Sequence, residues 1–229
     1  MKNYFELLDR IPLLSGIDTD PIKVIKDETI ITNWQNKRKI ELAKKSKNSE
    51  WADIGIICND PFVVILRDLV EFPDGNLGSY IRLYNRAYIE EGAAGVVTLP
   101  EKDGMLLLMH NFRHATRAWH WEIPRGFGEP GVDAEEQAKA ELSEEIGVNA
   151  SDIGLVNLGV FYSNTGLEGH SVNLFLAHIT SSGVPNQEIG VDELRWVSVT
   201  ELEKMIADGE ITDGFTIAAY TKAKLKGLI

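Results

Sequence analysis

The chain has 229 residues, 44% hydrophobic and 25% charged, which is ordinary for one large globular domain or two modest ones. Its formal net charge of −12 argues against broad nucleic-acid binding, and the single cysteine, Cys58, excludes an internal disulfide and favours a cytoplasmic location. No apolar run approaches the ~20 residues that span a bilayer, and the N-terminal stretch carries acids and a proline. We therefore expect neither a membrane span nor a signal peptide.

Residues 1–58 are expected to form an N-terminal extension, which is mainly helical or irregular over residues 1–50. Within it, the segment NKRKIELAKKSK at residues 36–47 is strongly basic. A solvated helix face is the first interpretation of this segment, and an anion-binding or nucleic-acid-binding patch is the alternative.

The pattern changes to strands after residue 60. Residues 62–72 are rich in β-branched residues, PDGN at 73–76 is a turn signal, and 77–85 return as a second strand. This pattern predicts a hairpin, and residues 94–112 repeat the order of strand, turn and strand. HWEIP at 120–124 predicts a short strand that ends at its proline.

Helices and strands alternate in the rest of the chain. Asp133 and Glu136 have the spacing of a capping box, and Gly147 supplies a C-terminal stop. Thr200 with Glu203 predicts the start of another helix, which ends near Asp208. Further elements are expected as strands at 153–162, 172–179 and 194–199 and as a last helix after Asp213. A mixed sheet with a central helix and C-terminal helices follows, in the α/β or α+β class.

The first of these helices concentrates acidic residues near its C-terminal end. Ala138, Leu142 and Ile146 recur on the core-facing side, whereas Glu141, Glu144 and Glu145 project together from another side. Neighbouring carboxylates repel, and the negative end of the helix dipole adds to the cost. A bound Mg²⁺ would reverse these penalties, because it takes oxygen ligands. A solvated acidic face is the alternative.

A glycine-rich segment, PRGFGEPG, leads directly into this helix. Gly126, Gly128 and Gly131 allow the backbone to approach a ligand closely and permit positive φ angles. The order of strand, glycine loop and acidic helix is what a metal–diphosphate site requires, and the loop therefore strengthens the metal interpretation.

Residues 126–148 resemble the Nudix box, G-x5-E-x7-R-E-U-x-E-E-x-G-U, where U is apolar. The pattern matches in register except at Val132, which replaces a Glu, and at Ala140, which replaces an Arg. The matching residues are Gly126, Glu141, Leu142, Glu144, Glu145, Gly147 and Val148. Over residues 60–215 the chain is similar to the ADP-ribose and ADP-sugar pyrophosphatase branch, in segments such as HNFRHATRAWHWEIPRGFGEPG.

This resemblance implies a Nudix fold, an α/β/α sandwich with a mixed sheet, at residues 59–229. Residues 1–58 and a first hairpin at about 60–85 would form an extension that contributes to a homodimer. The implied activity is Mg²⁺-dependent hydrolysis, with Mn²⁺ as an alternative ion, of a small nucleoside diphosphate derivative such as ADP-ribose or an ADP-sugar. A non-catalytic Nudix module that senses a nucleotide-sugar is the other reading.

The resemblance also implies roles for the matching acids. Glu141 and Glu145 would bind the metal directly, Glu144 would be a ligand or a neighbour of one, and a backbone carbonyl at Arg125 or Gly126 would complete the protein side. The general base of this branch is a Glu on a later loop. Glu188 is favoured for that role, and Glu193 and Glu168 are the alternatives.

Several residues next to the glycine loop are candidate substrate ligands. Arg113 could clamp phosphate, with Arg117 a weaker candidate, and Arg125 and Gly126 adjoin the same site. Glu122 could hydrogen-bond the ribose or the metal's waters, and Trp119 could stack on a base. Surface or core positions are the alternatives for each. We expect a core position for Phe112 and structural roles for the histidines His110, His114 and His120.

The departures at Val132 and Ala140 remove one acid and one base together. In the family the missing arginine helps to hold the adjacent glutamate, and an alanine has no group that can do so. Because both charges are lost together, we expect no buried charge to be left without a partner. The implied metal ligands remain, so we expect a working site.

Overall fold

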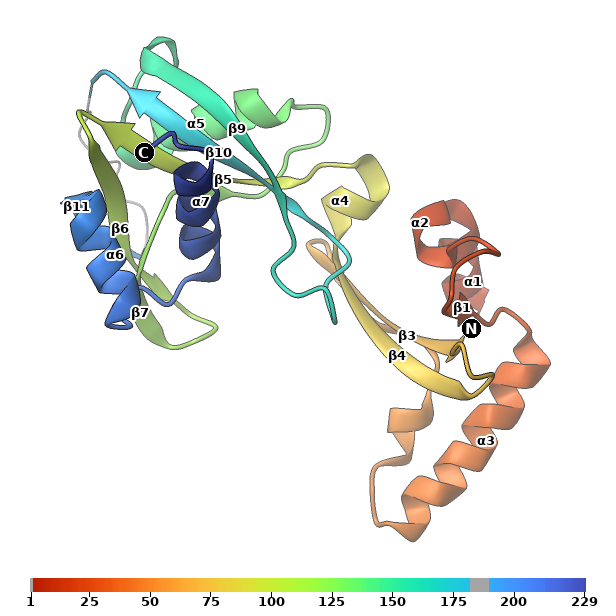
Figure 1. Ribbon diagram of the computed structural model, residues 1–229. Coiled ribbons are helices and arrows are strands. Elements are labelled where there is room, and N and C mark those ends of the chain that lie inside the picture. The colour runs from red at the N-terminus through yellow and green to blue at the C-terminus, as the bar shows by residue number, and fades with distance from the viewer. Residues whose placement is uncertain (1, 182–189) are drawn as a thin grey trace. The chain divides into compact units, whose positions relative to one another are not determined.

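The computed structural model describes residues 2–181 and 190–229 of the chain (Figure 1). Its internal contacts divide the chain into two compact units. The N-terminal unit comprises Met1–Glu90 and Asn164–His170, and the C-terminal unit comprises Glu91–Ser163 and Ser171–Ile229. The hairpin expected at about 60–85 therefore belongs to the N-terminal unit. The domain boundary expected after residue 58 stays a prediction, and it differs from this division into compact units.

The N-terminal unit combines helices with a small antiparallel sheet. Its strand β3 pairs with β1, β2 and β4, and the β3–β4 pair is the predicted hairpin, which turns at Gly75 with a φ of 80°. The elements are α1 (Lys2–Arg10), α2 (Pro12–Ser15), β1 (Lys23–Val24), α3 (Glu28–Lys44), β2 (Gly55–Asn59), β3 (Val63–Glu71), β4 (Leu77–Asn85) and α4 (Arg86–Glu91). The mainly helical extension expected before residue 50 is confirmed.

A buried polar cluster ties α1 to this sheet. The Tyr4 hydroxyl donates to Asp68 Oδ1 at 2.6 Å, and Arg82 Nε donates to Asp68 Oδ2 at the same distance. Arg82 also donates to the Tyr84 hydroxyl and to the Leu14 carbonyl, at 2.9 and 2.8 Å. Desolvation, reinforced by Asp68, raises the pKa of Tyr4 well above its ordinary value of 10.0.

The C-terminal unit is built on a mixed sheet. Among the described residues its strands follow the order β11-β6-β5-β10-β9, with β7 beside β6 and β8 beside β5. Strand β10 runs parallel to β5, and the other pairings are antiparallel. The elements are β5 (Gly95–Lys102), β6 (Met105–Arg113), β7 (Ala118–Glu122), β8 (Arg125–Gly126), α5 (Ala134–Ile146), β9 (Ile153–Phe161), β10 (Val172–Ile179), β11 (Val191–Ser198), α6 (Val199–Ala207) and α7 (Gly214–Leu225).

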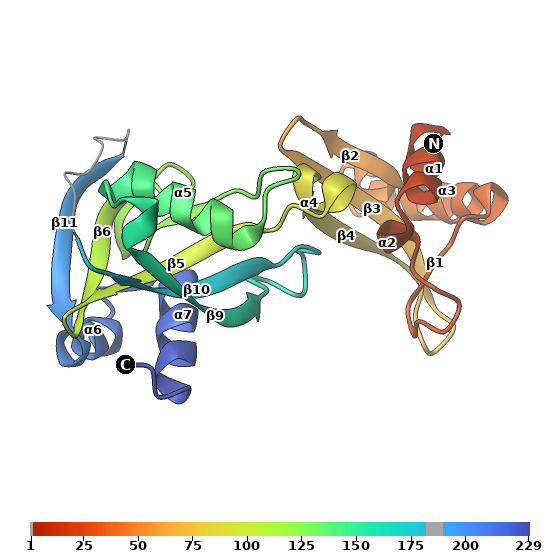
Figure 2. The same cartoon turned by 90° about the horizontal axis from the view of Figure 1, so that it is seen from above.

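Helices cover both faces of this sheet. Figure 2 shows α5 above the sheet and α6 and α7 below it. On the α5 side, Leu142 and Ile146 pack against Leu107 and Met109 of β6. On the other side, residues of α6 and α7 pack against β5 and β10. The α/β/α sandwich with a mixed sheet expected from the sequence is confirmed.

Strand β5 changes its neighbour along its length. Its last residues pair with the start of β6, at Glu101 with Leu106, whereas its first residues pair with β8, at Val96 with Gly126. The far end of β6 therefore pairs with β7 and β11 and not with β5. The glycine-rich loop fills this divergence with a short strand, β8, which the sequence did not predict.

Capping residues mark the ends of α5 and the start of α6. Asp133 accepts from the Glu135 amide at the start of α5, and Gly147 ends that helix with a left-handed φ of 67°, as predicted. The predicted cap of α6 is wrong by two positions. Its N-cap is Ser198, whose Oγ accepts from the Glu201 amide at 3.1 Å, and not Thr200. Both hydroxyl residues suit an N-cap, and the end of β11 at Ser198 decides between them.

The residues described by the structure contain no helix long and apolar enough to cross a membrane. The cytoplasmic location stays a prediction.

Candidate active site

A hollow of about 380 Å³ lies in the C-terminal unit where β6, β8 and α5 come together. Its lining contains several of the residues singled out from the sequence, which lie far apart along the chain. The lining residues are Asn111, Phe112, Arg113, Arg125, Gly126, Phe127, Glu129, Glu141, Glu145 and Val191. The fold therefore brings the acidic helix, the glycine loop and the end of β6 to one place.

The acids near the end of α5 divide into two groups. Glu141 and Glu145 are partly buried and line the hollow, one turn of helix apart. Glu144 is exposed and lies outside the lining. The structure therefore brings together the first and last of the three acids. The roles of all three as metal ligands remain predictions.

Gly126 lies directly against the carboxylate of Glu141. A Cβ atom added at Gly126 would overlap that carboxylate, so the Glu141 side chain would have to move. The contact brings the backbone of β8 beside an acidic side chain of α5, and the close approach to a ligand that the glycine pattern predicts stays a prediction. The backbone of β8 therefore passes next to the Glu141 carboxylate.

Gln137 was not singled out from the sequence, but it bonds to Glu141. Its Nε2 donates to Glu141 Oε1 at 2.8 Å, and the Gln137 side chain is only 5% exposed. The signal was present, because a Gln four residues before a Glu on a helix is placed for such a bond. Val132 and Ala140, the two departures from the pattern, are both exposed. The expectation that their loss leaves no buried charge without a partner stays a prediction.

Glu122 is the centre of a buried polar network whose donors, Asn111, Arg113 and Arg125, line the hollow. It is 0% exposed, and its oxygens accept from Asn111 Nδ2 at 2.9 Å, Arg113 Nε at 3.0 Å and Arg125 Nη2 at 3.1 Å. A second donor of Arg113, Nη2, makes the Arg113–Glu122 pair bidentate. Arg125 Nη1 also donates to Asp213 Oδ1 at 3.0 Å. The network therefore fixes both arginines of the lining.

These contacts bear on the predicted roles of Glu122 and Arg113. The sequence predicted that each could touch a ligand, and the structure shows the two bonded to each other. Glu122 is enclosed by its protein partners, whereas the Arg113 side chain is 36% exposed. The contact of Glu122 with a ribose or with the metal's waters stays a prediction.

The aromatic residues of β6 and β7 differ in exposure and in what they contact. Trp119 is 45% exposed and stacks on His110, with ring centroids 5.0 Å apart, but it lies outside the lining of the hollow. Trp121 packs against the core cluster on the α6 and α7 side. The core position expected for Phe112 is wrong, because Phe112 is only partly buried and lines the hollow at the end of β6.

The histidines contact protein groups. His110 Nδ1 lies 2.8 Å from Asp192 Oδ1, and His120 Nε2 lies 2.7 Å from Thr116 Oγ1. His114 Nδ1 lies 2.9 Å from Arg117 Nη1. These contacts agree with the structural roles expected for the three histidines.

The candidate general bases are placed differently. Glu188 lies outside the described residues. Glu193 is an exposed residue of β11 opposite His110 of β6. Glu168 belongs to the N-terminal unit, where it pairs with Leu83 of β4. The choice among the three stays a prediction.

The oxygen groups of the hollow suit Mg²⁺ bound partly by the protein. Within the described residues, no group of three or more His, Cys, Asp or Glu side chains is arranged to hold a metal. Mg²⁺ needs no such cage, because it is commonly bound by one or two carboxylates together with water and substrate phosphates. Glu141 and Glu145 supply hard oxygen donors of this kind. The residues present therefore fit the ion.

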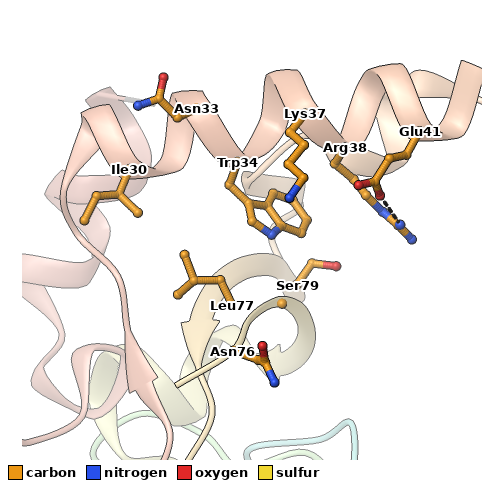
Figure 3. A pocket seen from close by; sticks show the side chains of 10 residues that line it. Ile30, Asn33, Trp34, Lys37, Arg38, Glu41, Asn76, Leu77 and Ser79 are labelled. Atoms are coloured by element: carbon orange, nitrogen blue, oxygen red, sulfur yellow. Dashed lines mark hydrogen bonds and ion pairs between the residues drawn. The ribbon is translucent and has the colours of Figure 1, made fainter. Parts of the chain in front are cut away.

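A second, larger hollow of about 720 Å³ lies within the N-terminal unit (Figure 3). It lies between α3 and the start of β4, with Trp34 and Lys37 on the helix side and Leu77 on the strand side. In the basic segment of α3, Arg38 pairs with Glu41 and Lys39 with Asp53. The helix is largely exposed, which agrees with the solvated face expected first. None of the acids of α5 is among the residues lining this hollow.

Comparisons with known proteins bear on the same region. The family model of the NUDIX domain matches residues 90–215. Over 160 residues, 69% of this chain and 82% of the relative, the chain is 29% identical to the ADP-ribose pyrophosphatase of Bacillus subtilis (strain 168). Over 174 residues, 75% of this chain and 81% of the relative, it is 21% identical to the CMP-5'-(N-acetyl-N-hydroxy-3-aminopropyl)phosphonate hydrolase of Streptomyces rubellomurinus (strain ATCC 31215).

A solved structure extends the likeness to the fold. The crystal structure of an ADP compounds hydrolase superposes with a TM-score of 0.61 at 18% sequence identity, over 77% of this chain and 93% of that one. At this identity the superposition shows the fold alone. The fold that the sequence resemblance implied is therefore confirmed.

Proposed function

The chain belongs to the Nudix family and is a Nudix pyrophosphohydrolase, and from this membership we propose its substrate and its metal. We propose that it hydrolyses the diphosphate of ADP-ribose or an ADP-sugar with Mg²⁺, or with Mn²⁺ in its place. The products are a mononucleotide and a sugar phosphate. The observation that carries the proposal is the placement of Glu141 and Glu145 in one hollow with Arg113 and Arg125.

Glu141, Glu145 and a backbone carbonyl at Arg125 or Gly126 would hold the ion in this proposal. Glu144 is exposed and would act beside them rather than as a main ligand. When bound, the ion neutralises the charge of a diphosphate and lowers the pKa of a bound water. An acidic protein needs this neutralisation to accept an anionic substrate.

Arg113 and Arg125 would bind the phosphate oxygens. A guanidinium carries five N–H donors, so the bonds to Glu122 and Asp213 leave donors of both arginines for an anion. Glu122 would position both arginines rather than touch the ribose, because its carboxylate is buried among protein donors. Base stacking by Trp119 is not part of the proposal, because Trp119 lies outside the lining.

The reaction is a hydrolysis at phosphorus. A water oxygen forms a bond to one phosphorus atom, the bond from that phosphorus to the bridging oxygen breaks, and the bridging oxygen leaves with the other phosphate. A carboxylate must accept the proton of the water. Glu188 is proposed for this role, with Glu193 and Glu168 as the alternatives.

The protein would act on this small molecule as a homodimer in the cytoplasm, without nucleic acid or membrane as a partner. The hairpin β3–β4 is the proposed dimerisation region. Light scattering coupled to size-exclusion chromatography tests the dimer, and a mass of 25.5 kDa in solution would contradict it.

Hydrolysis of a substrate panel tests the function. The panel contains ADP-ribose, ADP-sugars and matched CDP and GDP compounds, and mass spectrometry measures the mononucleotide released with Mg²⁺, with Mn²⁺ and with EDTA. We expect release from the ADP compounds only when metal is present. Nucleotide binding without hydrolysis of any panel member would contradict the proposal.

Substitution of the acids tests the site. We expect Glu145→Gln to lower kcat by at least about 100-fold, which corresponds to about 2.7 kcal/mol of transition-state stabilisation. The matched variant Glu144→Gln changes a neighbouring acid outside the lining, and we expect less than about tenfold. Equal losses in both variants would show that the lining does not define the metal site.

A further inference from the structure

Gln137 occupies an unusual position for a polar residue of α5. Its side chain is 5% exposed, on a helix whose other buried residues, Ala138, Leu142 and Ile146, are apolar. Its amide Nε2 donates to Glu141 Oε1 at 2.8 Å from one turn earlier in the helix. A buried amide is costly unless it is hydrogen-bonded, so this bond accounts for a polar group at this position.

The position where the family pattern has an arginine cannot supply the same bond. Ala140 is exposed and carries only a methyl group. Glu141 nevertheless has a bond from the same helix, because Gln137 donates to it from the preceding turn and from a buried position. We infer that Gln137 is a positioning residue that orients the carboxylate of Glu141 for a divalent cation, in place of the missing arginine. This inference rests on the proposed function, in which Glu141 is a metal ligand.

The physical basis is the restriction of one long side chain. A free glutamate samples several rotamers, and it must give up that freedom when it binds an ion. Gln137 donates to Oε1, and the backbone of Gly126 lies against the same carboxylate, so Glu141 is bonded on one side and packed against β8. The carboxamide is neutral, so it orients the carboxylate without the positive charge that would oppose a cation.

Direct metal binding tests this role. Binding of Mn²⁺ to the full chain, followed by electron paramagnetic resonance, is compared between the wild type and Gln137→Met, which keeps the size but removes the donor. We expect Mn²⁺ affinity to fall by about 10–100-fold, the usual effect of removing a group that orients a metal ligand. The metal concentration that half-saturates hydrolysis should rise by the same factor, whereas kcat at saturating Mn²⁺ should change by less than about threefold.

Leu142→Met is the matched control, because it alters a buried residue of α5 that faces the apolar core. A merely structural role of Gln137 would make both variants behave alike in Mn²⁺ binding, and that result would overturn the inference. Gln137→Ala serves if Gln137→Met does not fold, since it removes the donor without adding apolar bulk.

The outcomes separate this inference from the proposed function. Wild-type affinity in both Gln137 variants, with hydrolysis intact, would overturn the positioning role alone. Weaker Mn²⁺ binding in these variants, without hydrolysis of any panel substrate by the wild type, would support the positioning role and contradict the proposed substrate. Failure of the wild type to bind Mn²⁺ would overturn both the metal site and the inference.

Discussion

Glu122 holds together the basic residues of the active-site hollow. A carboxylate with no exposed surface would be strongly destabilising by itself, but here two arginines and an asparagine donate to it. Arg125 continues the network to Asp213, which also caps α7 by accepting from the Thr216 amide. One buried acid thereby connects β6, β7 and β8 to the start of a helix on the other face of the sheet.

Removal of this acid should be costly. We expect Glu122→Ala to lower the free energy of unfolding by about 3–5 kcal/mol, because Arg113 and Arg125 lose the carboxylate that compensates their charges. Urea denaturation followed by circular dichroism measures the change. The control is Lys204→Ala, which breaks an exposed pair with Asp208 in the same unit and should cost less than about 1 kcal/mol. Similar losses in both variants would contradict the network's role.

At the level of single residues, the sequence predicted which residues lie at the site better than it predicted their hydrogen-bond partners. The spacing along α5 placed Glu141 and Glu145 on one side, and both line the hollow. The sequence did not anticipate the bonds of Glu122 with Arg113, because these depend on how β6 and β7 pair. The register sets Glu122 opposite Met109, on the face that also carries Asn111 and Arg113. Such neighbours are not adjacent in sequence.

At the level of elements, periodicity predicted most helices and strands of the C-terminal unit. Strands with alternating or continuous apolar residues, and a helix with apolar residues every fourth position, bury the faces that the pattern indicates. The exceptions are short or local. Strand β8 has only two residues, so it is too short to show a period, and its pairing depends on β5. The cap of α6 depends on where β11 ends.

The corrected cap of α6 gives a prediction with an internal control. We expect Ser198→Ala to lower the free energy of unfolding by about 1 kcal/mol, because its Oγ accepts from the Glu201 amide. Thr200→Ala, two residues later in the same helix, should cost less than about 0.5 kcal/mol. Urea denaturation of the two variants measures the difference. A larger loss of unfolding free energy in Thr200→Ala would support Thr200 as the N-cap, as the sequence predicted.

At the level of the whole molecule, each unit has its own core and its own buried polar network. The N-terminal unit depends on Tyr4, Asp68 and Arg82, and the C-terminal unit depends on the network around Glu122. The N-terminal network should make stability depend on pH in the alkaline range. Tyr4 has a raised pKa in the folded protein because burial disfavours its charged form, so the folded chain keeps this proton when the unfolded chain releases it.

The sign of the pH effect follows from this difference. Below pH 10 the hydroxyl is protonated in both states, and the stabilisation is fully present. Above about pH 10 the unfolded chain loses the proton, and stability falls by about 1.4 kcal/mol per pH unit for this group. We expect Tyr4→Phe to be less stable at pH 8 by about 1–3 kcal/mol, through the lost bond to Asp68, but to lose less on going to pH 11. Urea denaturation at both pH values measures this, and equal losses would contradict it.

The division of the chain has a consequence for the exchange of gene segments. The chain passes from one unit to the other after Glu90, after Ser163 and after His170. In between, the loop at 164–170 bonds to the edge of β4, through the Leu83 amide to the Leu167 carbonyl and through the Gly169 amide to the Leu83 carbonyl, at 2.8 and 3.0 Å. A single crossover that replaced the first 90 codons would exchange β4 but keep the original loop at 164–170. The loop would then have to bond to a strand from another sequence. The loop and β4 should therefore be inherited as a matched pair, although 78 codons separate Asn85 from Asn164.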